Sequence, residues 1–252
     1  MGLNGLFSFC KKYIEKKKTA TAVKGRKIGV DIFWFIHKSK GDVNKIRVLL
    51  NDFIENCAMA LLVFDGKVSE DRKPELAFLK QKRGEMKQTI KELEKKLEEN
   101  QGELSDTQTR HLTDCIADLR IKSWAPHGNY IGIVKEAIRG WWGVERCKII
   151  TAPYEADLYF GELEAKGEID SIVSNDSDML ALGYKYLIRP NEDEVDFVMI
   201  YRIERILGEL RMSVDDWKQF MELCRKYLKT HGKSENYDIL VPYSQWRVYM
   251  RR

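Results

Sequence analysis

Cysteine and histidine are scarce in this 252-residue chain, and their spacing forms no recognisable metal-binding or disulfide pattern. The five cysteines are an odd number without a Cys-x-x-Cys pair, and only four histidines accompany them. A zinc site or a disulfide framework is therefore not expected. Scattered thiols of this kind are typical of a reducing compartment, so we expect a nuclear or cytoplasmic protein that is not secreted.

Long apolar runs are missing as well. No segment approaches the roughly 20 apolar residues that span a bilayer, and the first residues lack the apolar core of a signal peptide. We therefore expect no membrane segment and a mature N-terminus. The composition, 44% hydrophobic and 33% charged, is typical of a globular protein with room for one main α/β domain and a small appended element.

Positive charge is concentrated near the start of the chain, although the net charge is only +4. A single acid, Glu15, lies among eight cations in this region. Such a stretch attracts a polyanion such as nucleic acid, but a solvated basic face explains it equally well. The cations are Lys11, Lys12, Lys16, Lys17, Lys18, Lys24, Arg26 and Lys27.

Short apolar runs separated by helical patterns predict the core. Such runs are typical of buried parallel strands, and their alternation with helices predicts an α/β fold with a central, mostly parallel sheet flanked by helices. In sheets of this kind, ligands bind beyond the carboxyl ends of the strands. The strands are expected at residues 26–31, 59–65, 147–150 and 169–174, and the intervening helices at residues 46–54 and 154–165.

A long charged segment predicts a protruding helical hairpin over about residues 74–122. Apolar residues recur at helical spacing before Gly102, and Ser105 and Gln108 have the spacing of a capping box that begins a second helix. A coiled-coil projection without a role in binding is the alternative. Together with a helix over 129–142, the hairpin belongs to an expected core domain over residues 1–200.

A short, divergent helical region is expected over residues 201–252. Ser213 can cap a helix there, and Gly232 can end it. The apolar side of that helix is formed by Trp217, Phe220, Met221, Cys224 and Leu228.

Six acids fall where predicted strands end or a helix begins, and their placement suggests a shared site. So many carboxylates in one crevice repel each other and require a cation. Oxygen ligands favour hard divalent ions, Mg²⁺ above all, and two such ions support in-line attack on a phosphodiester. Each acid alone is more often a cap or a surface residue. The six are Asp31, Asp65, Glu155, Asp157, Asp176 and Asp178.

Cations follow Asp65 at the base of the predicted hairpin, where their long side chains could reach the metal site and contact phosphate. A solvated face of an exposed helix is the competing interpretation for each one. The cations are Lys67, Arg72, Lys73, Lys80, Lys82 and Arg83.

Five motifs in order resemble the flap endonuclease family, also called the Rad2 or XPG-type nucleases. The residues of these motifs, together with His37 between the first and second acid, are most similar to the exonuclease 1 branch. Because five motifs must coincide, the resemblance is far more specific than any one of them. The motifs are Met1–Leu6, Val30–Asp31, Val63–Lys67, Ala152–Asp157 and Asn175–Gly183.

The resemblance implies a PIN-like flap endonuclease core and a structure-specific DNA endonuclease or 5′–3′ exonuclease of repair, replication or recombination. It implies that the six acids bind two Mg²⁺ ions, with Mn²⁺ as a substitute. It implies phosphate contacts by Arg72, Lys80 and Arg83. The DNA, with a 5′ flap, nick, gap or free 5′ end, would also meet Gly2 and His37, although a capping or surface role for His37 is equally consistent with its pattern.

The chain departs from the family after Leu223-Cys224. The family supplies a seventh acid there and then a duplex-binding motif that often holds K⁺, whereas Arg225–Thr230 contains no acid. Asp238 could substitute from another loop. No sliding-clamp-binding tail is expected after Trp246. These features are typical of a compact, divergent or viral-like member of the family.

Two other functions remain open at this stage. The chain could be a catalytically weak member of the same fold that binds nucleic acid or protein, as the missing seventh acid suggests. It could also be an RNA-cutting enzyme with a related smaller carboxylate fold, which would explain the acids but not the hairpin. Retention of all six acids favours an active nuclease, because a binding module has no use for so much unneutralised charge.

Overall fold

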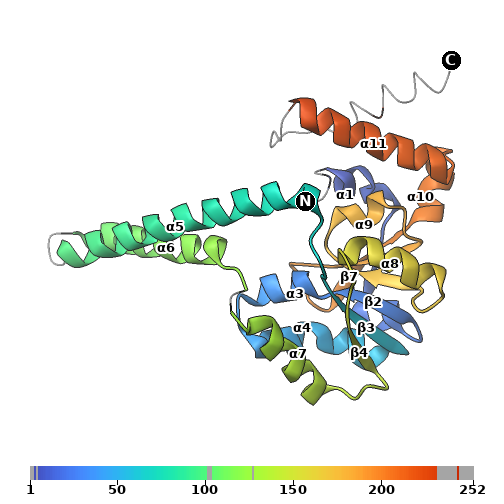
Figure 1. The fold of residues 1–252 in the computed structure, drawn as a ribbon, viewed down its shortest axis with the longest axis horizontal. Helices are drawn as coiled ribbons and strands as arrows, with labels where there is room; N and C mark the ends of the chain where they lie inside the picture. The colour runs from blue at the N-terminus through green and yellow to red at the C-terminus, as the bar shows by residue number, and fades with distance from the viewer. Residues whose placement is uncertain (1–2, 4, 101–103, 127, 232–242, 244–252) are drawn as a thin grey trace.

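A seven-stranded sheet forms the centre of the protein (Figure 1). The computed structural model describes residues 3, 5–100, 104–126, 128–231 and 243. The strand order across the sheet is β1-β7-β6-β5-β2-β3-β4. The strands are β1 (Glu15–Lys18), β2 (Lys27–Asp31), β3 (Met59–Phe64), β4 (Cys147–Thr151), β5 (Ser171–Val173), β6 (Tyr186–Pro190) and β7 (Phe197–Arg202).

Five neighbouring strands, β6, β5, β2, β3 and β4, are parallel, and β7 and β1 extend the sheet in antiparallel pairing. From β2 the chain proceeds to β3 and β4 on one side and only later returns to β5 on the other side. The strand order therefore reverses between β2 and β5. Parallel sheets have their binding crevice at such a switch point, beyond the carboxyl ends of the strands.

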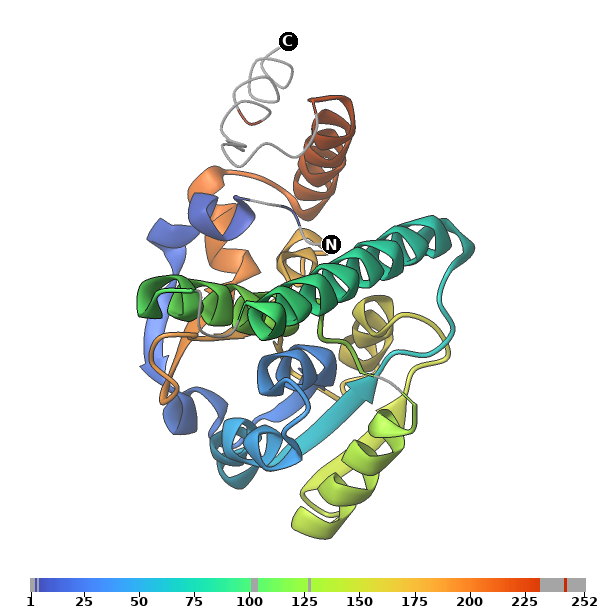
Figure 2. The same cartoon turned by 90° about the vertical axis from the view of Figure 1, so that its left-hand side faces the viewer.

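Helices cover both faces of the sheet, in agreement with the predicted α/β class (Figures 1 and 2). Two short 3₁₀ turns, Lys11–Tyr13 and Glu70–Arg72, link some of the elements. The helices are α1 (Leu6–Phe9), α2 (Thr19–Val23), α3 (Ile32–Ser39), α4 (Val43–Asn56), α5 (Lys73–Glu99), α6 (Asp106–Ser123), α7 (Tyr130–Trp141), α8 (Ala156–Ala165), α9 (Ser177–Ala181), α10 (Ile203–Leu210) and α11 (Val214–His231).

The sheet separates two apolar cores. One lies beneath α1, α8, α9, α10 and α11 and includes Phe160 and Trp217, both fully buried. The other lies beneath α2, α3, α4 and α7 and includes Phe35 and Leu50. Each such side chain contributes about 1.5–3 kcal/mol when it is buried. The strands that carry the acids are thus fixed from both sides. Within the described residues, no helix is long and apolar enough to cross a membrane.

Helices α5 and α6 form the predicted hairpin, which projects away from the sheet (Figure 1). Ser105 and Gln108 form the expected capping box at the start of α6. The hairpin buries little apolar surface: Ile90 on α5 and Ile116 on α6 are its buried large side chains in the described part. Gly102, predicted to interrupt the helices, lies outside the described residues.

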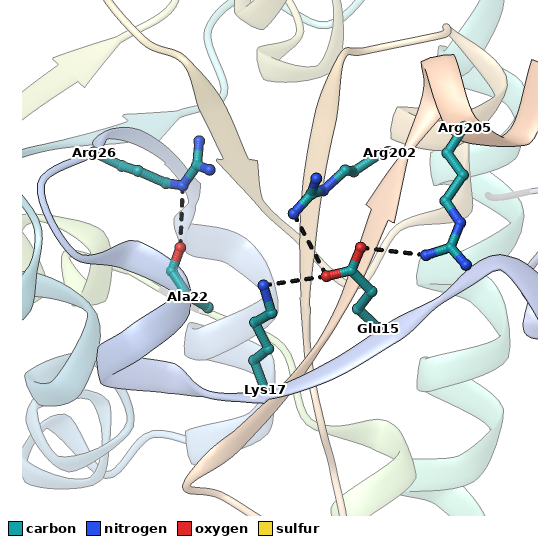
Figure 3. A network of polar contacts seen from close by, with 6 residues as sticks. All are labelled: Glu15, Lys17, Ala22, Arg26, Arg202 and Arg205. Atoms are coloured by element: carbon teal, nitrogen blue, oxygen red, sulfur yellow. Dashed lines mark hydrogen bonds and ion pairs between the residues drawn. The ribbon is translucent and has the colours of Figure 1, made fainter.

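The basic N-terminal stretch forms the edge strand β1 and the helix after it. Glu15 accepts contacts from Lys17, Arg202 and Arg205 (Figure 3). Lys16 pairs with Glu194, which lies far away in sequence. Acids that are distant in the sequence therefore neutralise part of the positive charge of this N-terminal stretch, in which Glu15 is the one nearby acid. Three cations around one carboxylate leave this edge of the sheet positive.

Helix α11 begins as predicted. The Ser213 hydroxyl oxygen accepts a hydrogen bond from the Asp216 N–H at 3.1 Å, and the Asp216 carboxylate accepts one from the Ser213 N–H at 2.8 Å. The fully buried Trp217 donates its indole N–H to the Leu180 carbonyl on α9 at 3.1 Å. The helix is therefore anchored directly on the segment that follows β5. The Leu228 side chain and Gly232, both part of the prediction, lie outside the described structure.

Replacement of Trp217 by alanine is expected to lower the free energy of unfolding by about 3–5 kcal/mol, because it opens a cavity between α11 and α9. Chemical denaturation followed by circular dichroism measures this change. Val214→Ala is the control, since Val214 lies on the same helix at 50% exposure and should change stability by less than about 0.5 kcal/mol. Equal stability of the two variants would contradict the packing described here.

Candidate functional site

The acids that the sequence singles out all lie at the carboxyl edge of the sheet. Asp31 is the last residue of β2, and Asp65 directly follows β3. Glu155 precedes the first residue of α8, and Asp157 lies in the first turn of that helix. After β5, Asp176 caps α9, and Asp178 lies in its first turn.

Three of these residues, Asp157, Asp176 and Asp178, form the most compact group (the three-acid group). Each offers a carboxylate oxygen, and these oxygens lie within 4.8 Å of one another. The turn after β5 creates this arrangement, because the Asp176 carboxylate accepts the Asp178 N–H at 2.9 Å. The Ser174 hydroxyl oxygen in turn accepts the Asp176 N–H at 3.0 Å. The oxygen-only donor set fits a hard divalent cation.

Asp31 and Asp65 complete what we call the acidic cluster, together with the three-acid group. Asp31 accepts the Ser174 hydroxyl at 2.9 Å and the Phe33 N–H at 3.1 Å. Asp65 accepts the Ala156 N–H at 2.9 Å, at the first residue of α8. Backbone N–H groups at the starts of α3 and α8, together with the Ser174 hydroxyl, thus orient the two carboxylates.

Burial and mutual repulsion disfavour the ionised form of this cluster. Burial is the main cause that raises the pKa of Asp31 to about 6, and the charges of Asp65 and Asp176 add to it. Burial also raises the pKa of Asp157 to about 7, helped by the other four carboxylates of the cluster. A carboxylate that is hard to ionise without a counter-charge marks a place for a cation.

Glu155 is the predicted acid whose hydrogen-bond partners lie outside the cluster. Its carboxylate accepts the Ser69 hydroxyl at 2.8 Å and pairs with Arg72 at 3.1 Å. Burial raises the pKa of Glu155, but these hydrogen bonds outweigh that effect and hold its pKa below the ordinary value. The structure therefore brings five of the six acids together and joins the sixth to the base of the hairpin.

The acidic cluster opens into a cleft of about 910 Å³. Arg72 and Arg83 of the hairpin base line it, together with His37. The other predicted cations do not line this cleft: Lys73 pairs with Glu70, Lys82 lies 4.8 Å from the centre of the Phe78 ring, and Lys67 and Lys80 are exposed. Gly2, predicted to contact DNA, lies outside the described residues.

His37 presents an aromatic surface to the cleft. Burial lowers its pKa, and the positive charges of Arg83 and Lys40 lower it further, so the imidazole is neutral at neutral pH. The ring packs edge-on against Trp124, with 5.6 Å between the ring centres. Its position is therefore set by the segment that follows the hairpin.

Further cleft residues were not predicted from the sequence. Phe33 and Trp34 line the cleft, and their position directly after Asp31 is a signal that could have identified them. Arg189 also lines it and lies 4.2 Å from the centre of the Phe7 ring. No local signal marks Arg189, because it lies on β6, which the pattern of apolar runs did not predict.

Gly66 holds two acid-bearing loops together. Its N–H donates to the Tyr154 carbonyl at 2.8 Å, and a Cβ at this position would lie 1.8 Å from the Ala152 carbonyl oxygen. No other residue fits without moving one of the loops. Because Asp65 and Asp157 flank this contact, the close approach sets the distance between their strands at the site.

The arrangement defines a class: a mostly parallel, helix-flanked sheet with an acidic cleft beneath a hairpin, the PIN-like fold of flap endonucleases. The XPG I-region family matches residues 146–226. Flap endonuclease 1 of Glycine max is 29% identical over 171 residues, which are 64% of this chain and 38% of that protein. The chain therefore spans well under half the length of this curated relative.

Solved structures share the fold. The catalytic core of Rad2 in complex with DNA substrate has a TM-score of 0.61 at 16% identity, covering 99% of this chain and 68% of that one. Flap endonuclease-1 from Methanococcus jannaschii has a TM-score of 0.56 at 18% identity, covering 95% and 76%. Human GEN1 in complex with Holliday junction DNA has a TM-score of 0.54 at 15% identity, covering 88% and 49%. The family match, the curated relative and these structures together support a likeness to the Rad2/XPG-type flap endonucleases.

Gly66→Ala is expected to lower the free energy of unfolding by about 1–3 kcal/mol, because its Cβ forces the two loops apart. It should also weaken Mn²⁺ binding, since Asp65 moves relative to Asp157. Gly84→Ala is the control, because a Cβ on this α5 residue meets nothing within 4 Å. That variant should be unchanged or up to about 1 kcal/mol more stable. Thermal melts and Mn²⁺ titrations of both variants test the difference.

The stability of the metal-free protein should fall as pH rises from about 4 to 7. The folded-state pKa values of Asp31, about 6, and Asp157, about 7, exceed the ordinary 3.8, so the folded state holds more protons in this window and deprotonation favours unfolding. The loss is on the order of a few kcal/mol. Melting temperatures in EDTA measure it. Asp157→Asn should show a shallower decline than the wild type, and an equally steep one would contradict the assignment.

Proposed function

We propose that this chain is a Mg²⁺-dependent, structure-specific nuclease that hydrolyses phosphodiester bonds in DNA near a 5′ flap, nick, gap or free 5′ end. The observation that carries the proposal is the convergence of five carboxylates at the switch point of the sheet. Four of them line a cleft that three arginines, Arg72, Arg83 and Arg189, also line. Carboxylates gather divalent ions, and arginines bind phosphate. Together they match a phosphodiester substrate.

The acidic cluster provides ligands for two divalent ions, as in-line phosphodiester hydrolysis with two metals requires. The three-acid group would hold one ion, and Asp31 and Asp65 would share in holding the other. Bound Mg²⁺ supplies an activated water and a counter-charge for the leaving oxygen. The protein contributes pre-oriented oxygens, because backbone N–H groups and Ser174 fix the carboxylates before any ion arrives.

The base of the hairpin would position the substrate. Arg72 is held beside the cluster by Glu155, and Arg83 lines the same cleft, so both can contact phosphates next to the cut. His37, Phe33 and Trp34 offer aromatic surfaces on which unpaired bases stack without sequence preference. Contacts to phosphate charge and stacking on bases of any identity favour recognition of the shape of the DNA over its sequence.

DNA as the substrate is also supported by relatives, since the Rad2 and GEN1 structures contain DNA. The preference for 5′ flaps or free 5′ ends rests on the family resemblance and on the hairpin above the cleft, beneath which a single strand would pass. A GEN1 complex with product DNA contains Mg²⁺ and Mn²⁺, which supports these two ions as the metals to test on this chain.

Asp176→Ala should reduce cleavage of end-labelled flap and nicked DNA by about 100-fold or more, because Asp176 belongs to the three-acid group at the centre of the proposed metal site. DNA binding should be largely retained. The assay compares flap, nicked, blunt and single-stranded DNA with and without Mg²⁺. Asp52→Ala, an exposed acid on α4, is the control and should cleave like the wild type. Equal cleavage by Asp176→Ala would reject the proposal.

A catalytically weak DNA-binding protein is the second candidate. The absence of an acid after Cys224, where an arginine stands instead, favours this alternative. The same assay separates the two functions, because a binding protein retains DNA without cutting it at any Mg²⁺ concentration.

A further inference from the structure

An arginine from the last described helix reaches the acidic cluster. The guanidinium of Arg225 on α11 lies 3.5 Å from the carboxylate of Asp178, one of the three-acid group. The two residues are far apart in the sequence and meet only because α11 folds back over α9 (Figure 1). Arg225 opposes the rise in the pKa of Asp178 that burial and Asp176 cause.

The core fixes the backbone position of Arg225. The preceding residue, Cys224, is fully buried, and so is Phe220 one turn earlier. Trp217 on the same face is bonded to the Leu180 carbonyl of α9, two residues after Asp178. The helix therefore cannot rotate or slide to withdraw Arg225 without breaking this packing. The contact with Asp178 is a consequence of how α11 is seated.

Arg225 also differs from Arg72, another arginine beside the acids. Arg72 is paired with Glu155, which is not part of the three-acid group, so much of its charge is already balanced. Arg225 pairs with a member of the three-acid group itself. The guanidinium lies at one side of the five-carboxylate cluster. Its positive charge offsets part of the negative charge that attracts a divalent ion to Asp178.

We propose that Arg225 acts as a resident counter-cation that weakens divalent-ion binding on the Asp178 side of the cluster. This inference rests on the proposed function. It adds that the two divalent ions bind with different affinities, the ion near Asp178 more weakly. An ion ligated by the same Asp178 oxygen lies within about 6 Å of the guanidinium, since Mg²⁺–oxygen distances are about 2.1 Å. The guanidinium repels the bound ion at this distance, and it also helps the ion by holding the Asp178 side chain in place. The repulsion is the larger effect, because fixing one short side chain saves little conformational entropy.

Removal of the charge should therefore tighten metal binding. In Mn²⁺ titrations of the whole chain, with free Mn²⁺ followed by electron paramagnetic resonance, Arg225→Gln is expected to bind the weaker ion about tenfold more tightly than the wild type. Arg225→Lys keeps the charge and should stay close to wild type. Lys226→Gln is the matched control, because it removes one charge at the adjacent residue, whose ammonium pairs with Glu222. Its affinity should be unchanged.

The possible outcomes separate the two proposals. Unchanged or weaker Mn²⁺ binding by Arg225→Gln, in a variant with the wild-type circular dichroism spectrum, would overturn the role of Arg225 and leave the nuclease intact. Tightening by Arg225→Lys to the same extent would also overturn it, since the charge is then not the cause. A wild-type protein that takes up no Mn²⁺ and cuts no DNA would overturn the proposed function itself.

Discussion

Repulsion between carboxylates at one edge of a parallel sheet is the constraint on which the rest of this structure depends. The reversal of strand order between β2 and β5 brings the acid-bearing ends together. Burial is the larger cause that raises the pKa values of Asp31 and Asp157, and the charges of the neighbouring acids raise them further, so the ionised cluster is unfavourable without a counter-charge. The fold tolerates it because two apolar cores, one on each face, hold the strands in place regardless of the charge at their ends.

The sequence predicted those parts of the fold whose signal is local. Each of the parallel strands β2, β3, β4 and β5 is an apolar run followed closely by an acid, so the strand and the site residue were identified together. The hairpin was predicted from heptad-like spacing and the Ser105 capping box, which depend on neighbours within a few positions. For the same reason, five of the acids expected in one place do lie together.

The parts that could not be predicted depend on contacts between distant residues. Strand β1 is mostly lysine and becomes a strand only because β7 pairs with it. No local pattern shows that Glu155 meets Arg72 or that Arg225 meets Asp178. Spacing in the sequence suggested that Glu155 and Asp157 would reach a common point. In the structure the Glu155 carboxylate pairs with Arg72 at the base of the hairpin, and Asp157 lies in the three-acid group.

The hairpin has a topological consequence. The chain leaves the sheet at the end of β3 and returns at the start of β4, and these two strands are hydrogen-bonded neighbours. Because β3 and β4 are parallel, the intervening segment, which contains α5, α6 and α7, leaves the sheet at its carboxyl edge and must return to the opposite edge before β4 begins. The base of the hairpin therefore starts at the same edge as Asp65, and the path through α7 brings the chain back along the sheet to the start of β4.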